Sequence, residues 1–234
     1  MRKISTLLFT LSIFLVVSGC DCITGEGPVV SEYRDIGDFT GIKLNISAKV
    51  IIDQGMDGQC RIETQQNILE ALETEVEGGV LHISLDQPCI TRHDDIKIYV
   101  SMNEIDYIKI SGSGDIVGKS MLKADHLDMK ISGSGDIKLK VDADKIQSTI
   151  SGSGTIELAG KARKHEININ GSGDVRAVDM PVKTCKVKIS GSGDCEVYAL
   201  RKLYIKISGS GNTYYKGSPE IESHVSGSGV VRNF

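Results

Sequence analysis

The sequence predicts an all-β protein, a parallel β-helix (β-solenoid) built from repeats of about 19 residues. Three observations lead to this prediction. A Ser-Gly-Ser-Gly cassette occurs seven times at intervals of 18 to 21 residues, apolar β-branched residues flank every copy, and helical spacing is confined to one short segment. A fixed period near 20 residues is typical of repeat proteins, in which each repeat buries its apolar face against its neighbours. Flexible Gly/Ser linkers lack such flanking residues.

Aligning the cassettes shows which positions face the core. Each cassette follows an isoleucine or a valine, a second inward position lies two residues earlier, and a third follows the cassette. This alternation is typical of half-buried strands. Each repeat is therefore expected to contain a strand, a corner, a second strand and a second turn. The cassettes begin at Ser111, Ser132, Ser151, Asn170, Ser190, Ser208 and Ser226.

The cassettes are predicted to form structural corners that stack in columns. They contain 14 of the 26 glycines, the residue favoured where backbones approach closely or bend sharply. Acidic residues directly after a cassette are expected to cap backbone N–H groups of the turn. The predicted corner residues are Gly112, Gly114, Gly133, Gly135, Gly152, Gly154, Asp115, Asp136, Asp174 and Asp194. An antiparallel meander or barrel of the same strands remains the alternative, although hairpins would not need the same tetrapeptide at every corner.

The N-terminus has the pattern of an export signal. Arg2 and Lys3 precede an apolar stretch that is too short to span a bilayer as a mature helix. The stretch ends in Val-Ser-Gly-Cys, which resembles the bacterial lipobox, so Cys20 is predicted to carry the lipid that anchors the protein to a membrane. An ordinary secretory signal that happens to contain a cysteine is the alternative.

The predicted organisation has three parts. Residues 1–19 are the lipoprotein signal peptide, residues 20–32 are the lipidated cysteine with its tether, and residues 33–234 are the solenoid domain. Within this domain an irregular β region, residues 33–103, precedes the repeats of residues 104–234. The irregular region contains several alternating segments and one short helical pattern at residues 65–75.

The charge of the mature chain argues against a nucleic-acid binder. Removing residues 1–19 leaves 25 of 27 Lys and Arg against 31 Asp and Glu, a net charge of about −6. The four cysteines of the body do not have the spacing of a metal site, so neither a metal nor a cofactor is predicted. In an oxidising compartment we expect a Cys185–Cys195 disulfide and a Cys60–Cys89 disulfide, with Cys22 unpaired.

The cassettes, together with "DFTGIKLNISAKVIIDQG" near the start and "YYKGSPEIESHVSGSG" at the end, closely resemble the family of auto-transporter adhesins with a head GIN domain. The resemblance covers about residues 33–234. It implies a right-handed β-helix and a lipoprotein of the Gram-negative envelope, with an outer-membrane location that faces either the periplasm or the exterior. Asn170 and Thr155 depart from the cassette pattern, which suits a structural corner better than an active site.

Two other functions are weighed against adhesion. The first is calcium binding, because repeated Gly-x-Gly-Asp superficially resembles a β-roll, but each coil offers a single Asp rather than a nine-residue repeat with ligands on both turns. The second is a polysaccharide-processing β-helix enzyme using the stacked aspartates. The sequence contains no Ser/His/Asp arrangement, phosphate loop or HExxH motif, and its five histidines are scattered, so no catalytic residue is predicted.

A column of outward lysines is the candidate ligand face. It occupies outward positions two residues before the cassettes, and it would suit an anionic glycan or a surface protein. The alternative is a solvated face whose charges are offset by neighbouring acids. The lysines are Lys109, Lys130, Lys188 and Lys206. The sequence thus predicts an exported, membrane-anchored lipoprotein that acts as a non-enzymatic, adhesin-like module, and it leaves the oligomeric state open.

Overall fold

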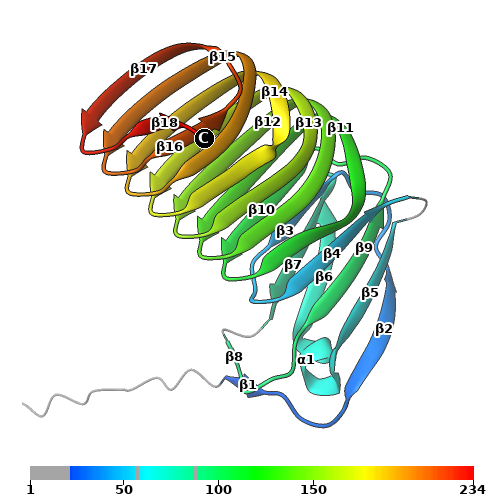
Figure 1. Ribbon diagram of the computed structural model, residues 1–234. Helices are drawn as coiled ribbons and strands as arrows, with labels where there is room; N and C mark the ends of the chain where they lie inside the picture. Colours follow the sequence, from blue (N-terminus) through cyan, green and yellow to red (C-terminus); the bar gives the residue numbers. More distant parts are fainter. Residues whose placement is uncertain (1–21, 56–57, 87–88) are drawn as a thin grey trace, which may run out of the picture.

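The computed structural model describes residues 22–55, 58–86 and 89–234, so the predicted signal peptide and Cys20 lie outside the described residues. Strands make up 73% of the protein and helix 3%, and parallel coils stack into a β-solenoid of about seven turns (Figure 1). The predicted all-β solenoid is confirmed. An antiparallel meander is excluded for the repeats, because every pairing among their strands is parallel.

The repeat coils stack residue upon residue at their corners. Each cassette pairs with the equivalent residues of the next coil, as in Ser111 with Ser132 and Gly112 with Gly133. The strands continue around the second turn of each coil and are therefore long. After the shorter β10 (Tyr107–Gly112), they are β11 (Asp115–Gly133), β12 (Asp136–Gly152), β13 (Thr155–Gly171), β14 (Asp174–Gly191) and β15 (Cys195–Gly209). β16 (Thr213–Lys216) follows β15, and the last coil contains β17 (Glu220–Gly227) and β18 (Val231–Asn233), which pair with β15 and β16 respectively.

A column of isoleucines runs through the core of the repeats, and columns of mixed composition lie beside it. The isoleucine before each cassette is at most 1% exposed from Ile110 through Ile207. Each buried isoleucine removes apolar surface worth about 2 kcal/mol from water, and stacking adds close contacts between coils. The core is therefore continuous along the whole axis.

The irregular region supplies two further coils, and their order in space differs from their order in the chain. One coil contains β3 (Gly41–Leu44) and β4 (Lys49–Gln54), and the other contains β7 (Val80–Leu85) and β9 (Lys97–Met102). The β3/β4 coil lies between the β7/β9 coil and the first repeat coil. A segment early in the chain is thus inserted between two later ones.

Antiparallel strands and a short helix cover the N-terminal end of the solenoid. Three antiparallel pairings occur here: β2 (Val29–Asp35) with β5 (Gln59–Gln65), β5 with β9, and β6 (Leu72–Glu77) with β7. The helix α1 (Gln66–Ala71) buries Ile68 and Leu69. The helix predicted at residues 65–75 is shorter than expected, because Leu72 is already extended and begins the strand that pairs with β7. A separate two-stranded sheet joins β1 (Ile23–Thr24) to β8 (Ile90–Thr91).

Candidate functional site

The glycine corners hold neighbouring coils in direct backbone contact. Gly133 has a φ of 137°, and a Cβ there would lie 2.3 Å from the carbonyl oxygen of Gly112. A Cβ on Gly135 would lie 2.1 Å from the carbonyl oxygen of Gly114. Between them, the Ser134 N–H donates to Gly112 O at 2.9 Å. Gly152 and Gly154 repeat this geometry one coil later, so the corners leave no space for a ligand between coils.

The aspartates after the cassettes link coils rather than capping their own turns. Asp136 Oδ1 accepts from the Thr155 N–H at 2.8 Å, and Asp174 Oδ1 accepts from the Asp194 N–H at 3.0 Å. In the same way, Asp115 Oδ1 accepts from the Asp136 N–H, and Asp194 Oδ1 accepts from the Asn212 N–H. The prediction of caps within each turn is wrong in this respect, because the carboxylates reach along the solenoid axis to the next coil. They form an inter-coil ladder.

This ladder leaves the aspartates poorly placed for metal or acid-base chemistry. Each carboxylate named above accepts a backbone hydrogen bond, and the column is interrupted at Thr155, where the Asp174 N–H donates to Gly154 O at 3.1 Å instead. Across the part of the chain that the structure describes, no three His, Cys, Asp or Glu residues are arranged to hold a metal ion.

The predicted lysine column exists in register on one wall of the solenoid. Lys109 pairs with Lys130, and Lys188 with Lys206, while Thr149 and Asn168 separate the two pairs. Lys188 and Lys206 are exposed, whereas Lys109 and Lys130 are half-buried.

Lys130 is already engaged by protein groups. It donates to Asp128 Oδ2 at 2.6 Å and lies 5.3 Å from the centre of the Tyr107 ring. The hydrogen bond with Asp128 raises the pKa of Lys130. The half of the column nearest the C-terminus is therefore the freer cationic surface.

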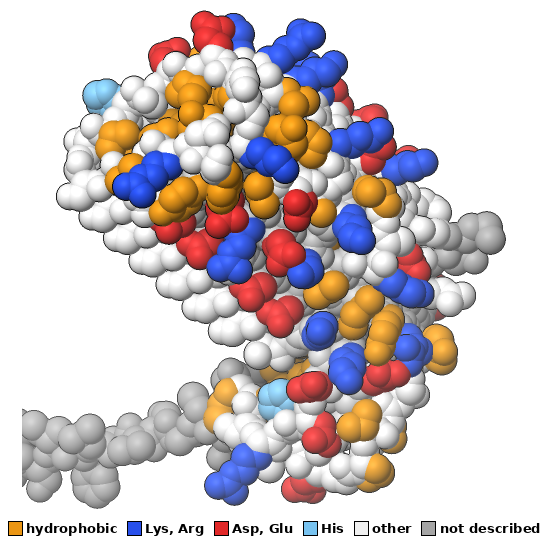
Figure 2. Space-filling model, viewed as in Figure 1, with side chains coloured by type: hydrophobic (Ala, Val, Ile, Leu, Met, Phe, Trp, Pro, Cys, Tyr) orange, Lys and Arg blue, Asp and Glu red, His pale blue; other side chains and the backbone are white. Residues whose placement is uncertain are grey.

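On the other walls, positive and negative side chains are interleaved. Figure 2 shows Lys and Arg beside Asp and Glu over the visible face rather than gathered in one patch. One outward column alternates in sign from coil to coil, and Lys138 and Glu157 within it form an ion pair at 2.7 Å. This column runs through Lys138, Glu157, Arg176 and Glu196. These charges neutralise one another and define no ligand site.

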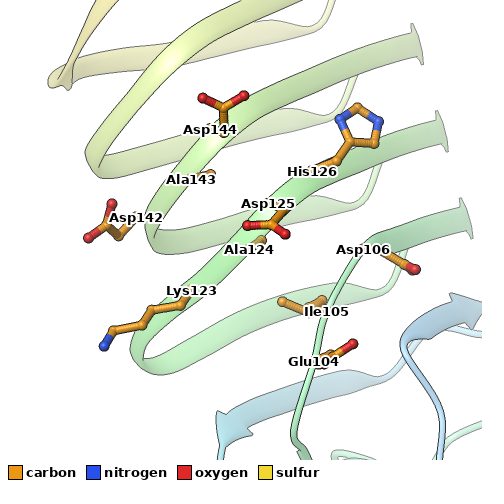
Figure 3. A pocket seen from close by; sticks show the side chains of 10 residues that line it. All are labelled: Glu104, Ile105, Asp106, Lys123, Ala124, Asp125, His126, Asp142, Ala143 and Asp144. Atoms are coloured by element: carbon orange, nitrogen blue, oxygen red, sulfur yellow. The ribbon is translucent and has the colours of Figure 1, made fainter.

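A shallow depression lies where the first repeat coils meet the segment before β10. Its acidic side chains come from different levels of the solenoid and diverge from one another (Figure 3). Asp144 pairs with Arg163, which lowers the pKa of Asp144, and Asp142 pairs with Lys161 at 3.2 Å. Carboxylates that diverge cannot share one substrate as the acid and base of a glycosidase do.

A pair of polar side chains lies buried within the core of the repeats. His165 Nε2 and Ser148 Oγ are 2.9 Å apart, and both side chains are buried. Burial lowers the pKa of His165 to about 3, so the ring is neutral. In the core column that contains His165, the next coil contributes Cys185. No nucleophile is accessible here, because this cluster has no exposed atom through which a substrate would approach.

Both predicted disulfides are wrong. Cys89 pairs with Cys22, with a Cα–Cα distance of 4.8 Å, and the Ile23 N–H donates to Cys89 O at 3.0 Å. Cys60 is free and lies in β5, buried opposite Val100. Sequence reasoning missed the pairing of β1 with β8, which brings the N-terminal segment beside residue 89.

Cys185 and Cys195 are also free and buried. They precede and follow the same corner, so they occupy different core columns: Cys185 between His165 and Leu203, and Cys195 between Val175 and Thr213. Burial raises the pKa of Cys185 to about 12 and that of Cys60 to about 11. These thiols therefore stay protonated and unreactive.

The parallel coils, glycine corners and filled core define a β-solenoid whose available surfaces are its outer walls and its ends. The chain belongs to the family described as "Putative auto-transporter adhesin, head GIN domain", which matches residues 38–219. The resemblance stated from the sequence is confirmed.

Solved structures share this fold. A putative adhesin from Bacteroides fragilis is 22% identical with a TM-score of 0.86, covering 91% of this chain and 100% of its own. A structure from Parabacteroides distasonis called a putative lipid binding protein is 26% identical, with a TM-score of 0.76 and coverage of 92% and 100%. A putative adhesin from the same organism is 24% identical, with a TM-score of 0.74 and the same coverage. No curated protein sequence matches the chain.

Proposed function

We propose that the chain is an exported lipoprotein, anchored through an acylated Cys20, whose solenoid acts as a non-enzymatic, adhesin-like module of the cell envelope. Membership of an adhesin family and the adhesin names of its structural neighbours support the adhesive role. The observation that carries the anchored arrangement is the Cys22–Cys89 disulfide, which leaves one residue between the anchor cysteine and the folded body.

The disulfide supports the proposal that the covered N-terminal end of the solenoid lies at the membrane. Cys22, β1 and β8 lie beside the covered N-terminal end, and the last coil lies at the far end (Figure 1). In the described residues no helix has the length and apolar character needed to cross a bilayer. An acyl chain at residue 20 would hold the covered end at the membrane and direct the walls and the last coil outward.

Membrane anchoring is tested by replacing the acylated residue. Cys20→Ala is expected to move the protein from the membrane fraction to a soluble exported fraction, because the thiol that receives the lipid is lost. Cys22→Ser is the matched control, since it removes the neighbouring cysteine and its disulfide but leaves the lipobox cysteine in place. Equal membrane retention of Cys20→Ala and wild type would refute the anchor. Protease shaving of intact cells then decides whether the solenoid faces the exterior.

The ligand we propose for the walls is an anionic glycan, bound at the lysine column. Lys188→Glu combined with Lys206→Glu is expected to abolish retention on a sulfated-polysaccharide column at low salt, because these two lysines are the exposed members of the column. Lys140→Glu with Lys183→Glu changes the net charge equally at exposed positions outside this column, and its retention should fall only slightly. Equal loss in the two double variants would show a general charge effect. Unchanged retention in both would mean that the column is only a solvated face.

A further inference from the structure

The last coil of the solenoid exposes its core columns. Leu203 and Ile207 are fully buried, whereas Ile221 and Val225, which pair with them one coil later, are 39% and 37% exposed. Every residue of β17 is exposed. No described strand lies beyond this coil, so apolar side chains that are core elsewhere meet solvent here.

The backbone of β17 is open along the same edge. β17 pairs with β15 on one side, and no described strand pairs with its other side. Natural edge strands are usually short or carry inward charges or proline, which discourage pairing with another chain. β17 has eight residues, contains no proline, and places Ile221, Ser223 and Val225 at its inward positions. It has the features of an edge that accepts another strand.

The two ends of the solenoid differ in how their core columns are covered and not in having strand edges, since among the described strands β2 and β6 also pair on one side only. The N-terminal end is covered by antiparallel strands and α1, and it carries the Cys22–Cys89 disulfide. The exposed core columns and the β17 edge are at the opposite end (Figure 1). An interaction surface at this place would project away from the anchor.

We propose that the open end binds a second copy of this chain, with the two β17 strands pairing antiparallel about a two-fold axis through Ser223. Such an interface is isologous, so both copies use the same surface and the association closes as a dimer. Where the copies are anchored on facing membranes, which rests on the proposed function, the dimer would join the two membranes as a homophilic adhesin.

The sequence of β17 is self-complementary in this one register. With the axis at Ser223, Ile221 lies opposite Val225 of the second copy on the inward side. On the outward side Glu222 lies opposite His224 of the second copy, whose ring N–H can donate to the carboxylate. Moving the axis by one residue would place His224 opposite His224 or Glu222 opposite Glu222. Both alternatives lose the donor–acceptor match and separate Ile221 from Val225.

Sedimentation of the chain from Asp21 to Phe234, which contains every described residue, tests the dimer. Wild type is expected to dimerise with a dissociation constant of roughly 10 μM, as a small interface predicts. Ile221→Lys should raise this constant roughly 100-fold, because the change occurs twice per dimer. Met121→Lys is the matched control, since Met121 is 46% exposed on a wall, and it should leave the constant unchanged. A wild type that stays monomeric at roughly 1 mM would overturn the proposal.

The register is tested by charge and by cross-linking. His224→Glu should prevent dimerisation by placing acids opposite each other, and adding Glu222→His to it should restore the dimer. Ser223→Cys should give a disulfide-linked dimer under mild oxidation, because the two residues 223 face each other at the axis. Ser226→Cys, three residues away, should not. Cys60, Cys185 and Cys195 are buried and do not compete. Efficient cross-linking of Ser226→Cys, or none of Ser223→Cys, would contradict this register.

The proposed joining of two facing membranes by the dimer can be tested separately with vesicles. Vesicles carrying the acylated protein should cluster, and clustering should be lost with Ile221→Lys. If soluble chains dimerise but acylation at Cys20 fails, the proposed function fails and the inference about the open end stands. If the protein is acylated but monomeric, and its vesicles stay dispersed, the inference fails and the anchor stands.

Discussion

The two halves of the solenoid form coils by different means. In the N-terminal half the corner that stacks under the first cassette is Asn45 to Ala48, which contains no glycine, and antiparallel strands and a disulfide cover the end. In the repeat half glycine columns let similar coils stack at backbone distance, and no described strand covers the end. Regular repetition thus allows a coil to be added at any point but provides no means of ending the stack, whereas irregular sequence provides a cap.

The largest effect is expected at the glycine corners, where the two halves meet. Gly112 and Gly133 both have positive φ, but a Cβ on Gly112 would meet nothing within 4 Å, whereas one on Gly133 would overlap the backbone of Gly112. Gly112→Ala should therefore reduce the free energy of unfolding by roughly 1 to 3 kcal/mol through backbone strain alone. Gly133→Ala should reduce it by more than about 4 kcal/mol. Denaturant titration of the pair measures the difference, and equal losses would contradict the stacking.

The disulfide should have the next largest effect. It joins residues 67 apart in sequence. Replacing Cys22 and Cys89 together by serine should lower the free energy of unfolding by roughly 2 to 4 kcal/mol, because the unfolded chain regains the freedom that the closed loop removes. Reduction of the wild type should reproduce the shift and leave the double variant unaffected. A reductant that destabilises both proteins alike would assign the effect to another cause.

The repeat half could be predicted from sequence more fully than the N-terminal half, for a physical reason. A coil with period near 20 must stack on the next coil in the chain, so the spacing of Ser132 and Ser151 determines their pairing in space. The β3/β4 coil follows no period, and only tertiary packing places it between the β7/β9 coil and the first repeat.

The candidate sites follow the same division. The lysine column could be predicted because repeat register places Lys188 beside Lys206. The Cys22–Cys89 disulfide could not, because it depends on where two irregular segments meet. The inter-coil role of Asp136 was missed because alternation indicates which face a side chain takes, and not whether it bonds its own turn or the next coil.

The buried histidine of the repeat half predicts a dependence of stability on pH. The pKa of His165 is lowered to about 3 by burial, against 6.5 ordinarily, so below pH 6.5 the unfolded chain binds a proton that the folded chain does not. Stability should therefore fall as pH decreases from 6.5 toward 3, by about 1.4 kcal/mol per pH unit. Between pH 7 and 5 His165 would account for about 2 kcal/mol. The double variant Ser148→Ala, His165→Leu should show a smaller slope in denaturation at these pH values, and an unchanged slope would assign it to other groups.

The smallest effect is expected in the aspartate ladder, which distinguishes structural corners from a calcium site. Asp136→Ala removes the acceptor for the Thr155 N–H and should lower the free energy of unfolding by about 1 kcal/mol. Asp136→Asn should lower it by much less, because the amide oxygen can still accept that hydrogen bond. A calcium site predicts instead that Asp136→Asn is damaging, because loss of the carboxylate charge would abolish the stabilisation that a bound ion provides. Melting temperatures of wild type and Asp136→Asn in calcium and in EDTA separate the two. Agreement within a degree fits the ladder, and a calcium-dependent rise of several degrees that Asp136→Asn removes would establish a metal site at the corners.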